Sequence, residues 1–279
     1  MSMVINHNVL SLTAQRNLSA SQMDLDQAVN RLSSGLRINN AWEDPAGLAI
    51  SERFRAQIAG MEEAERNANY NINLLETAEG AASVIDEKLV RMRALAVQAS
   101  NGALNQNAGD RASLDVEFQA LKSEITRIAN VTNYNGLALI NGSYSSASLK
   151  FHIGTHNVEG ADYYFVNIGS MTASALGLDS VSLTNTTNAQ SAIETIDGAI
   201  STKDTERSNL GSYVERLQNT ILNLQISREN AVKSESQIRD ADIAAEMSNF
   251  TRNQILMQSG VAMLTQANMV PQMISQLIG

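Results

Sequence analysis

The first candidate for chemistry is a pair of histidines. His152 and His156 stand four residues apart, the spacing at which two imidazoles on a helix can share a zinc ion. They fall in a predicted strand and the loop after it, where residues four apart lie about 13 Å from each other. A zinc-protease motif also needs a glutamate after the first histidine, and Ile153 stands there. The pair therefore predicts no metal site.

A second candidate is the acidic cluster of Asp240, Asp242 and Glu246, whose carboxylates could suggest a cation site. We interpret it as the solvated start of a helix, because carboxylates complement the positive end of a helix dipole. The sequence contains no cysteine, phosphate loop or nucleophile elbow. We expect the C-terminal methionines to pack between helices rather than to bind a cofactor. The sequence therefore predicts neither an enzyme nor a cofactor.

The composition narrows the class of partner. The 279 residues carry a net charge of −9 and no basic cluster, whereas binding to nucleic acid needs grouped lysines and arginines. No stretch reaches the roughly 20 apolar residues that span a bilayer. The first residues lack a basic region followed by an apolar core, so we expect no secretory signal peptide. These features predict a chain that binds neither nucleic acid nor membrane.

The apolar residues at both ends follow the spacing of a coiled coil. Residues alternately four and three apart keep one stripe of a helix facing a partner, so we expect the two ends to pack against each other. Small and amide residues dilute the stripe, which makes it weak in one chain and more favourable when many copies assemble. The expected assembly seams are Leu18, Leu25 and Leu32, and Ile243, Met247, Phe250, Met257, Val261 and Leu264.

Long helices and one short β region are expected to position these seams. Proline occurs only at Pro45 and Pro271, which leaves the interior free of this helix breaker. Gly35 suits the left-handed end of a first helix, and Asp44 with Pro45 suits the start of the next. Two short segments in the middle of the chain alternate in the way that strands do, and they predict a β-hairpin. The predicted helices cover 3–34, 45–100, 110–130, 189–236 and a segment after 242, and the predicted strands cover 149–153 and 162–168.

The predicted fold is mainly α, with long antiparallel helices in a rod-like coiled-coil bundle and a small β-hairpin region. We expect residues 1–43 and 239–279 to form a terminal coiled-coil domain. Residues 44–238 are expected to form a helical rod domain, with the hairpin region at about 133–170. Turn residues occupy 134–136.

The two ends of the sequence closely resemble bacterial flagellin. The N-terminal motifs are Ile5-Asn6-His7-Asn8, Leu32-Ser33-Ser34-Gly35-Leu36-Arg37-Ile38-Asn39 and Asp44-Pro45-Ala46-Gly47-Leu48-Ala49-Ile50-Ser51. The C-terminal motif is Ser236-Gln237-Ile238-Arg239-Asp240-Ala241-Asp242-Ile243-Ala244-Ala245-Glu246-Met247, and similarity continues to Pro271-Gln272. The resemblance covers about the first 140 and the last 90 residues. The short middle is similar to core flagellins that lack the outer variable domains.

The resemblance implies a structural subunit that polymerises into the helical flagellar filament used for bacterial motility. It also implies terminal segments that fold on assembly and line the filament channel. The implied partners are further copies of the chain, an export chaperone on the C-terminal segment, and the hook–filament junction and cap proteins. Export through the flagellar type III apparatus would place the filament outside the cell, and a periplasmic flagellum is an alternative.

The resemblance also implies a surface for innate immune recognition. Many flagellins are sensed by a vertebrate Toll-like receptor through a patch of arginine, leucine and glutamate. The segment 89–98 resembles that motif and implies Arg91 and Leu95, and counting back from Asn135 implies Glu117. The alternative is that these residues make ordinary assembly contacts, because the same surface would be buried in the filament.

Two serine- and threonine-rich segments, 143–147 and 180–187, are expected to be exposed loops. Many flagellins carry O-linked sugar on such loops, and unmodified loops are the alternative. The candidate glycosylation sites are Ser143, Ser145, Ser146, Thr184, Thr186 and Thr187.

Two other functional classes compete with the filament subunit. A hook–filament junction protein has related ends, but it usually matches the terminal motifs less completely. An enzyme or toxin that borrows flagellin ends needs a catalytic insertion, and the segment 141–182 is too short for one.

Overall fold

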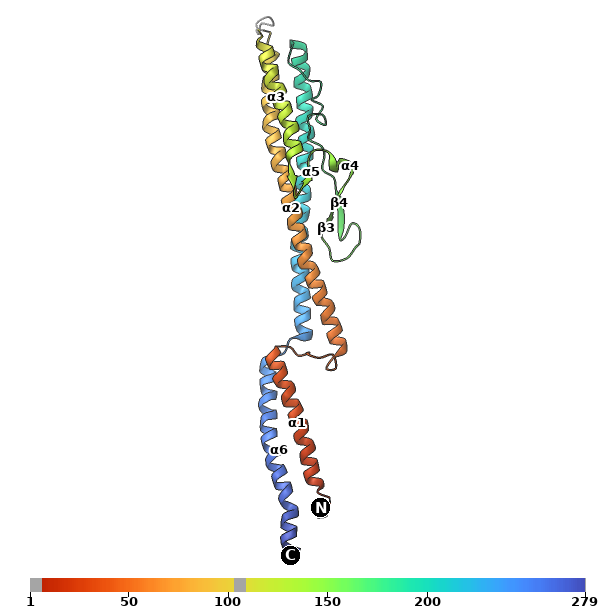
Figure 1. Ribbon diagram of the computed structural model, residues 1–279, viewed down its shortest axis with the longest axis vertical. Helices are drawn as coiled ribbons and strands as arrows, with labels where there is room; N and C mark the ends of the chain where they lie inside the picture. The colour runs from red at the N-terminus through yellow and green to blue at the C-terminus, as the bar shows by residue number, and fades with distance from the viewer. Residues whose placement is uncertain (1–6, 103–108, 279) are drawn as a thin grey trace. The chain divides into compact units, whose positions relative to one another are not determined.

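The computed structural model describes residues 7–102 and 109–278, and it divides the chain into two compact units (Figure 1). The terminal unit comprises Met1–Ile58 and Glu229–Gly279, and the central unit comprises Ala59–Arg228. The fold is mainly α with long helices and two small antiparallel hairpins, which confirms the predicted fold class. The helices are α1 Val9–Ser34, α2 Pro45–Ala99, α3 Asp110–Val131, α4 Ser143–Ser146, α5 Thr186–Arg239 and α6 Ile243–Ile278.

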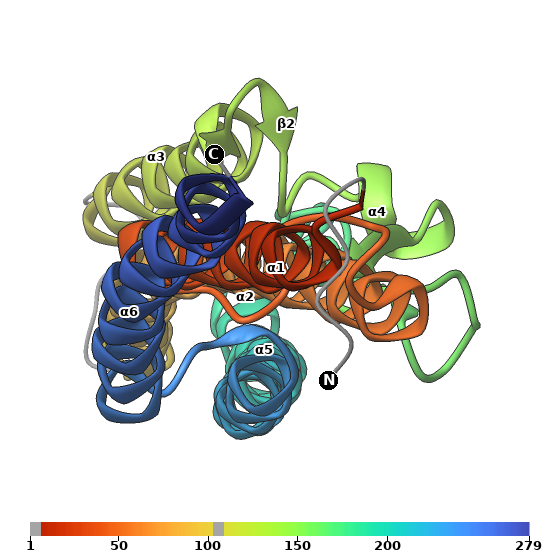
Figure 2. The ribbon, with the colours of Figure 1, turned by 90° about the horizontal axis from the view of Figure 1, so that it is seen from below.

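In the terminal unit α1 and α6 lie side by side along their lengths (Figures 1 and 2). The side chain of Asn8 caps the start of α1 by accepting a hydrogen bond from the Ser11 backbone N–H at 3.0 Å. Gly35 ends the helix with φ +73°, the left-handed conformation predicted for it. The predicted residues 3–6 of this helix lie outside the described residues.

A short antiparallel bridge joins the two segments that connect the terminal helices to α2 and α5. Leu36 pairs with Asp240, the Arg37 N–H donates to the Arg239 carbonyl at 2.6 Å, and the Ala241 N–H donates to the Gly35 carbonyl at 3.0 Å. The two connectors therefore satisfy each other's backbone groups, which neither could do within its own short segment.

The start of α2 agrees with the sequence prediction. The Asp44 side chain accepts from the Gly47 backbone N–H at 2.8 Å, and Pro45 occupies the first helical position. At the other end Arg111 of α3 is buried and donates to the carbonyls of Ala99 and Asn101 at 2.9 and 2.8 Å. A guanidinium at this place satisfies the free carbonyls that any helix leaves at its C-terminus.

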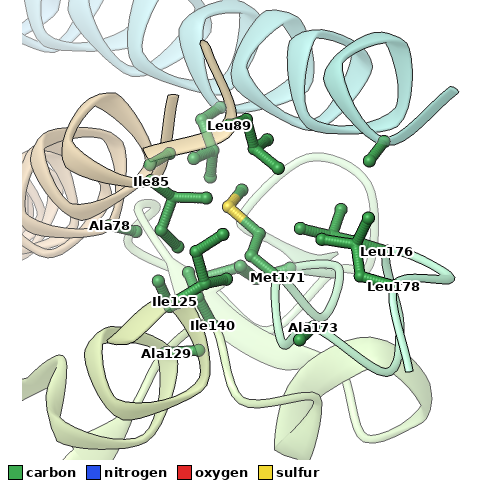
Figure 3. Packing of buried hydrophobic residues seen from close by; sticks show 14 of the residues in the cluster. Ala78, Ile85, Leu89, Ile125, Ala129, Ile140, Met171, Ala173, Leu176 and Leu178 are labelled. Atoms are coloured by element: carbon green, nitrogen blue, oxygen red, sulfur yellow. The ribbon is translucent and has the colours of Figure 1, made fainter. Parts of the chain in front are cut away.

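The central unit holds the core. The buried residues of α2 follow a four-three spacing from Met61 to Ala96, because that face packs on α3 and α5. Figure 3 shows how Ile85 and Leu89 of α2 meet Ile125 of α3 around Met171, whose loop closes the cluster. Long helices thus share one continuous apolar interior with the segment that follows the hairpins.

Two hairpins stand in the central unit where one was predicted. The predicted pair is present as β3 Leu149–His152 and β4 Tyr163–Val166, with Phe151 opposite Tyr164. The sequence assigned only turn residues to 134–136, whereas β1 Asn133–Tyr134 and β2 Leu137–Ala138 flank a tight turn there. Asn135 and Gly136 have φ +50° and +81°, as a two-residue hairpin turn requires. Strands of two residues are too short for alternation to reveal them.

Candidate assembly surface

The N-terminal seam faces α6. Leu18, Leu25 and Leu32 are half-buried on one side of α1, and Ala28 on the same side is fully buried. Leu18 lies against Gly260 of α6, where an added Cβ would stand 3.2 Å from the Leu18 Cδ1. A glycine at this position therefore lets the two backbones approach closely.

The C-terminal seam is split between two faces of α6. Phe250, Met257 and Leu264 are half-buried, whereas Ile243, Met247 and Val261 are 49%, 47% and 51% exposed. The expectation that the whole stripe packs on α1 is therefore wrong for Ile243, Met247 and Val261. The sequence pattern merged two neighbouring stripes, because most faces of α6 carry apolar residues and several phases fit the spacing.

Three positions that the apolar four-three spacing did not identify lie on the side of α6 that contacts α1. Glu246 forms a 3.9 Å ion pair with Arg31, Gly260 packs on Leu18, and the Ala267 carbonyl accepts from the Asn8 side chain at 2.8 Å. Glu246, Gly260 and Ala267 are separated by multiples of seven residues, the repeat of a coiled coil. The sequence could have revealed this contact through the small and charged residues that recur at one heptad position.

The outward side of α6 is apolar and nearly free of charge. Within Ile243–Ile278 only Glu246 and Arg252 carry a charge. A helix that is apolar on more than one face is normally buried on more than one face. We call the following residues the outward face of α6: Ile243, Met247, Ile255, Leu256, Val261, Met263, Met269 and Met273, all of which are exposed.

A shallow apolar groove runs where α1 and α6 meet. It encloses about 360 Å³, and its walls include Leu10 and Leu18 from α1 and Leu256 and Met263 from α6, with Gly260 between them. Two of the residues that line this groove, Leu18 and Gly260, also bring the two helices close together. The exposed apolar residues Val9, Leu10, Leu12, Met23 and Val29 form the outward face of α1. The groove belongs to the candidate assembly surface, which consists of the outward faces of α1 and α6.

The three residues of the predicted receptor patch occupy different environments in the central unit. Arg91 and Glu117 are exposed and form an ion pair at 2.7 Å across α2 and α3. Leu95 is only 1% exposed and belongs to the core, so it is not available as a surface contact. The expectation of a three-residue surface is therefore wrong for Leu95, whose motif position coincides with a core position of α2.

The candidate glycosylation sites lie partly in helices rather than in loops. Ser143, Ser145 and Ser146 are exposed but belong to α4, and Thr186 and Thr187 form the start of α5. Thr184 and Thr187 are exposed, whereas Thr186 is half-buried. The predicted loops are therefore wrong at 143–146 and at 186–187, because a four-residue helix and the first residues of a long helix are too short to show apolar periodicity.

The two histidines lie at the β3–β4 hairpin, in different contacts. The His152 ring stacks on Tyr163, and the His156 Nδ1 stands 4.0 Å from an Asp162 carboxylate oxygen. Asp162 accepts from the backbone N–H groups of His156 and Val158 at 3.1 and 3.0 Å, and these hydrogen bonds hold the pKa of its carboxyl below the usual value. Asp162 thus organises the loop of the hairpin.

The acidic cluster at 240–246 is a helix start, as interpreted. The Asp242 side chain accepts from the backbone N–H groups of Ala244 and Ala245 at 2.9 and 3.2 Å. Within residues 7–102 and 109–278, no group of three or more histidine, aspartate or glutamate side chains could hold a metal ion. In the same part of the chain no helix combines the length and the apolar character needed to cross a membrane.

Comparison with known proteins identifies the family. Residues 5–145 match the bacterial flagellin N-terminal helical region, and residues 193–278 match the bacterial flagellin C-terminal helical region. The chain is 42% identical over 276 residues to a flagellin of Halalkalibacterium halodurans, covering 99% of this chain and all of that one. It is 39% identical over 290 residues to the flagellar filament 33 kDa core protein of Treponema phagedenis, with the same coverage of both chains.

A solved structure of a putative flagellar hook-associated protein from Vibrio parahaemolyticus shares the fold. It aligns with a TM-score of 0.58 over 71% of this chain and all of that one, at 14% identity. At that identity the likeness concerns the fold alone, whereas the full-length matches are to flagellins. The chain therefore belongs to the bacterial flagellin family.

Proposed function

We propose that this chain is the structural subunit of a bacterial flagellar filament and that its copies join through the outward faces of α1 and α6. The observation that supports this most strongly is the composition of α6. Its outward face exposes eight large apolar residues, and the whole helix carries two charges. An exposed apolar surface of this size is typical of a site where another protein surface binds.

The physical argument concerns the free energy of assembly. Fully burying a leucine, isoleucine, valine or methionine side chain contributes about 1.5–3 kcal/mol, and half-exposed residues contribute part of that. The gain must exceed the conformational entropy lost when side chains and helix ends become ordered. Contacts between different surfaces of identical copies build an open helical filament when the rotation between copies does not close a ring.

The proposed layers follow the sequence boundaries. Residues 1–43 and 239–279 would form the inner coiled-coil layer, and residues 44–238 a second helical layer with the hairpins. A structural subunit of this kind requires no catalytic group. The filament would be a flagellar structure outside the cell, with a periplasmic flagellum as the alternative.

Seeded polymerisation tests the proposal. Purified chain is added to short filament fragments and elongation is followed by negative-stain electron microscopy. We expect full-length chain to elongate the seeds, and chains lacking residues 1–30 or 250–279 to fail. Met263→Glu, which places a charge on the outward face of α6, should also prevent elongation. Val158→Glu is the matched control, because Val158 is similarly exposed on the hairpin loop.

A hook–filament junction protein is the competing function. Its signature in the same experiment would be short rings or caps on the seeds, with no elongation by the full-length chain. The relatives that match over the full length carry flagellin or filament core protein names, which favours the filament subunit.

Further partners follow from the proposed role. An export chaperone would bind the C-terminal segment before assembly, and cap and hook–filament junction proteins would meet the ends of the filament. Pull-down of full-length chain against the chain lacking residues 250–279 tests the chaperone contact. Intact mass of protein purified from its native filament tests glycosylation at the exposed serines and threonines of α4 and 184–187.

Receptor recognition rests on Arg91 and Glu117. The two side chains form an exposed pair on α2 and α3, so a soluble monomer offers them to a vertebrate Toll-like receptor. Arg91→Asp should abolish signalling by the monomer, and Arg127→Asp, which alters another exposed arginine paired on α3, should leave it intact. Unchanged signalling by Arg91→Asp would leave only an assembly role for this surface.

A further inference from the structure

Four of the ion pairs between α2 and α5 recur at one heptad position of α2, and a fifth, Glu52 with Arg239, lies off that line. Residues seven apart stay on one line of a coiled coil, and charged pairs along that line set the partner and orientation of the helices. We call these four pairs the charge ladder: Glu65 with Arg228, Glu79 with Arg207, Asp86 with Lys203, and Arg93 with Asp197. The first three place the acid on α2, whereas the last reverses the sign.

Lys203 differs from every other cation of the ladder in its burial. It is 1% exposed, and its Nζ binds the carboxylates of Asp86 and Asp204, with 2.7 Å to the Asp204 Oδ1. Its partners' side chains keep contact with water, at 33% exposed for Asp86 and 59% for Asp204. Removing an ammonium group from water is costly, and replacing a buried pair by apolar residues is often neutral or stabilising. Stability alone therefore does not account for a lysine at this position.

Alignment of the helices does account for it. Sliding α5 by one heptad moves it about 10 Å along α2, and the apolar stripes of both helices still meet after such a slide. In one direction Asp86 then faces Leu210, and in the other it faces Ile196, both of which are fully buried. Asp86 would lose its partner, and the buried Lys203 would keep only Asp204 of its own helix. Separating a buried ammonium from a carboxylate that compensates it is destabilising.

We propose that the Lys203–Asp86 pair fixes the register of α2 against α5, and we call this pair the register key. It excludes the shifted alignments that the apolar stripes alone would allow. The β3–β4 hairpin depends on this alignment because it touches both helices. Thr155 in its loop lies against Gly60 of α2, and the Tyr164 ring lies 3.9 Å from the Arg216 guanidinium of α5. A slide would separate these contacts and change the surface that the central unit presents to neighbouring copies.

Distance measurements between α2 and α5 test the register key. The chain has no cysteine, so nitroxide labels can be placed only at introduced cysteines, here Val84→Cys and Glu194→Cys, both at exposed positions. The two positions are offset along the helix axes, so a slide changes their separation. Pulsed electron paramagnetic resonance on the monomer should give one distance for the otherwise unchanged chain. Lys203→Met should add a second distance population, because the apolar stripes then also accept the slid alignment.

Lys233→Met is the matched control, because Lys233 lies on the same helix but is exposed and paired only within α5. It should keep a single distance. One unchanged distance for Lys203→Met would overturn the proposal. If Lys203→Met does not fold, the proposal is tested with the double variant Asp86→Lys with Lys203→Asp, in which the two charges are exchanged. Recovery of the native distance supports a key made by opposite charges, and failure to recover it refutes one.

Discussion

The terminal and central units are built from similar helices but are packed very differently. The central unit encloses a continuous core, part of which Figure 3 shows, and Ile85, Leu89 and Phe118 in it have no exposed surface. Along α1 and α6 only Ala28 and Ala267 are buried among the side chains that the structure describes. The central unit therefore carries its own stability. The terminal pair leaves apolar surface exposed, which assembly would cover.

The reason for the difference is the number of partners available to each helix. In the central unit α2 packs on α3, on α5 and on the hairpin region, so several faces are covered. In the terminal unit α6 has α1 along one face, and its apolar residues extend beyond that face. A pair of helices buries one stripe each, whereas a larger bundle also buries the flanks.

The strongest way to test the comparison is to create the same cavity in both units. Leu89→Ala in the central core should lower the free energy of unfolding by about 2–5 kcal/mol, because a fully buried side chain leaves a cavity. Leu18→Ala on half-buried α1 should cost clearly less. Chemical denaturation followed by circular dichroism measures both. Equal losses would contradict the idea that only the central unit has a packed interior.

Removing a buried polar anchor should have the next largest effect. Arg111→Met deletes the guanidinium that binds the carbonyls of Ala99 and Asn101, and hydrogen bonds to a charged group are worth about 1.5–3 kcal/mol. The end of α2 should fray first, which hydrogen exchange of its last turn would reveal. The exposed Arg127→Met provides the control, since its ion pair lies within one helix and should contribute little.

Replacing a glycine by a larger residue should have opposite effects in the two units: it should stabilise the central unit and disrupt the terminal unit. Gly211 of α5 has open space around it, so Gly211→Ala should stabilise the central unit by up to about 1 kcal/mol through helix propensity. Gly260→Leu should force α1 and α6 apart, because Leu18 already fills the space, and should reduce filament elongation. Thermal unfolding and seeded elongation are the measurements. Normal elongation by Gly260→Leu would show that the close approach of α1 and α6 is not needed for assembly.

The smallest predicted effect is a pH dependence in the connector of the terminal unit. Burial acts to raise the pKa of Glu43, but hydrogen bonds from the backbone N–H groups of Asn39 and Asn40 and from Gln27 outweigh it and lower the pKa from 4.5. A carboxyl with a lowered folded pKa stabilises the fold above its unfolded pKa. This contribution should disappear as the pH falls from about 4.5 through the lowered value.

Hydrogen exchange of the Asn39 and Asn40 amides, measured across this pH range, is the check. Protection should fall at acidic pH in the unchanged chain. Glu43→Gln should show weaker protection with little pH dependence, because the amide does not titrate. Equal protection in the unchanged chain and in Glu43→Gln at neutral pH would contradict the assigned role of the carboxylate.

The sequence determined the helical architecture because its signals are local. The left-handed Gly35, the Asp44 and Pro45 start and the apolar spacing of α2 each act within a few residues. The family resemblance was likewise visible in the motifs at both ends, and the comparisons confirm it.

Only the tertiary structure decided which apolar stripe of α6 meets α1, and that Leu95 lies in the core rather than on the surface. It also decided that Arg111 closes α2 and that Lys203 is buried between α2 and α5. These features depend on partners far apart in the sequence. A periodic pattern fixes the spacing of a stripe, but the choice among neighbouring stripes and registers follows from which backbones approach and which charges find a partner.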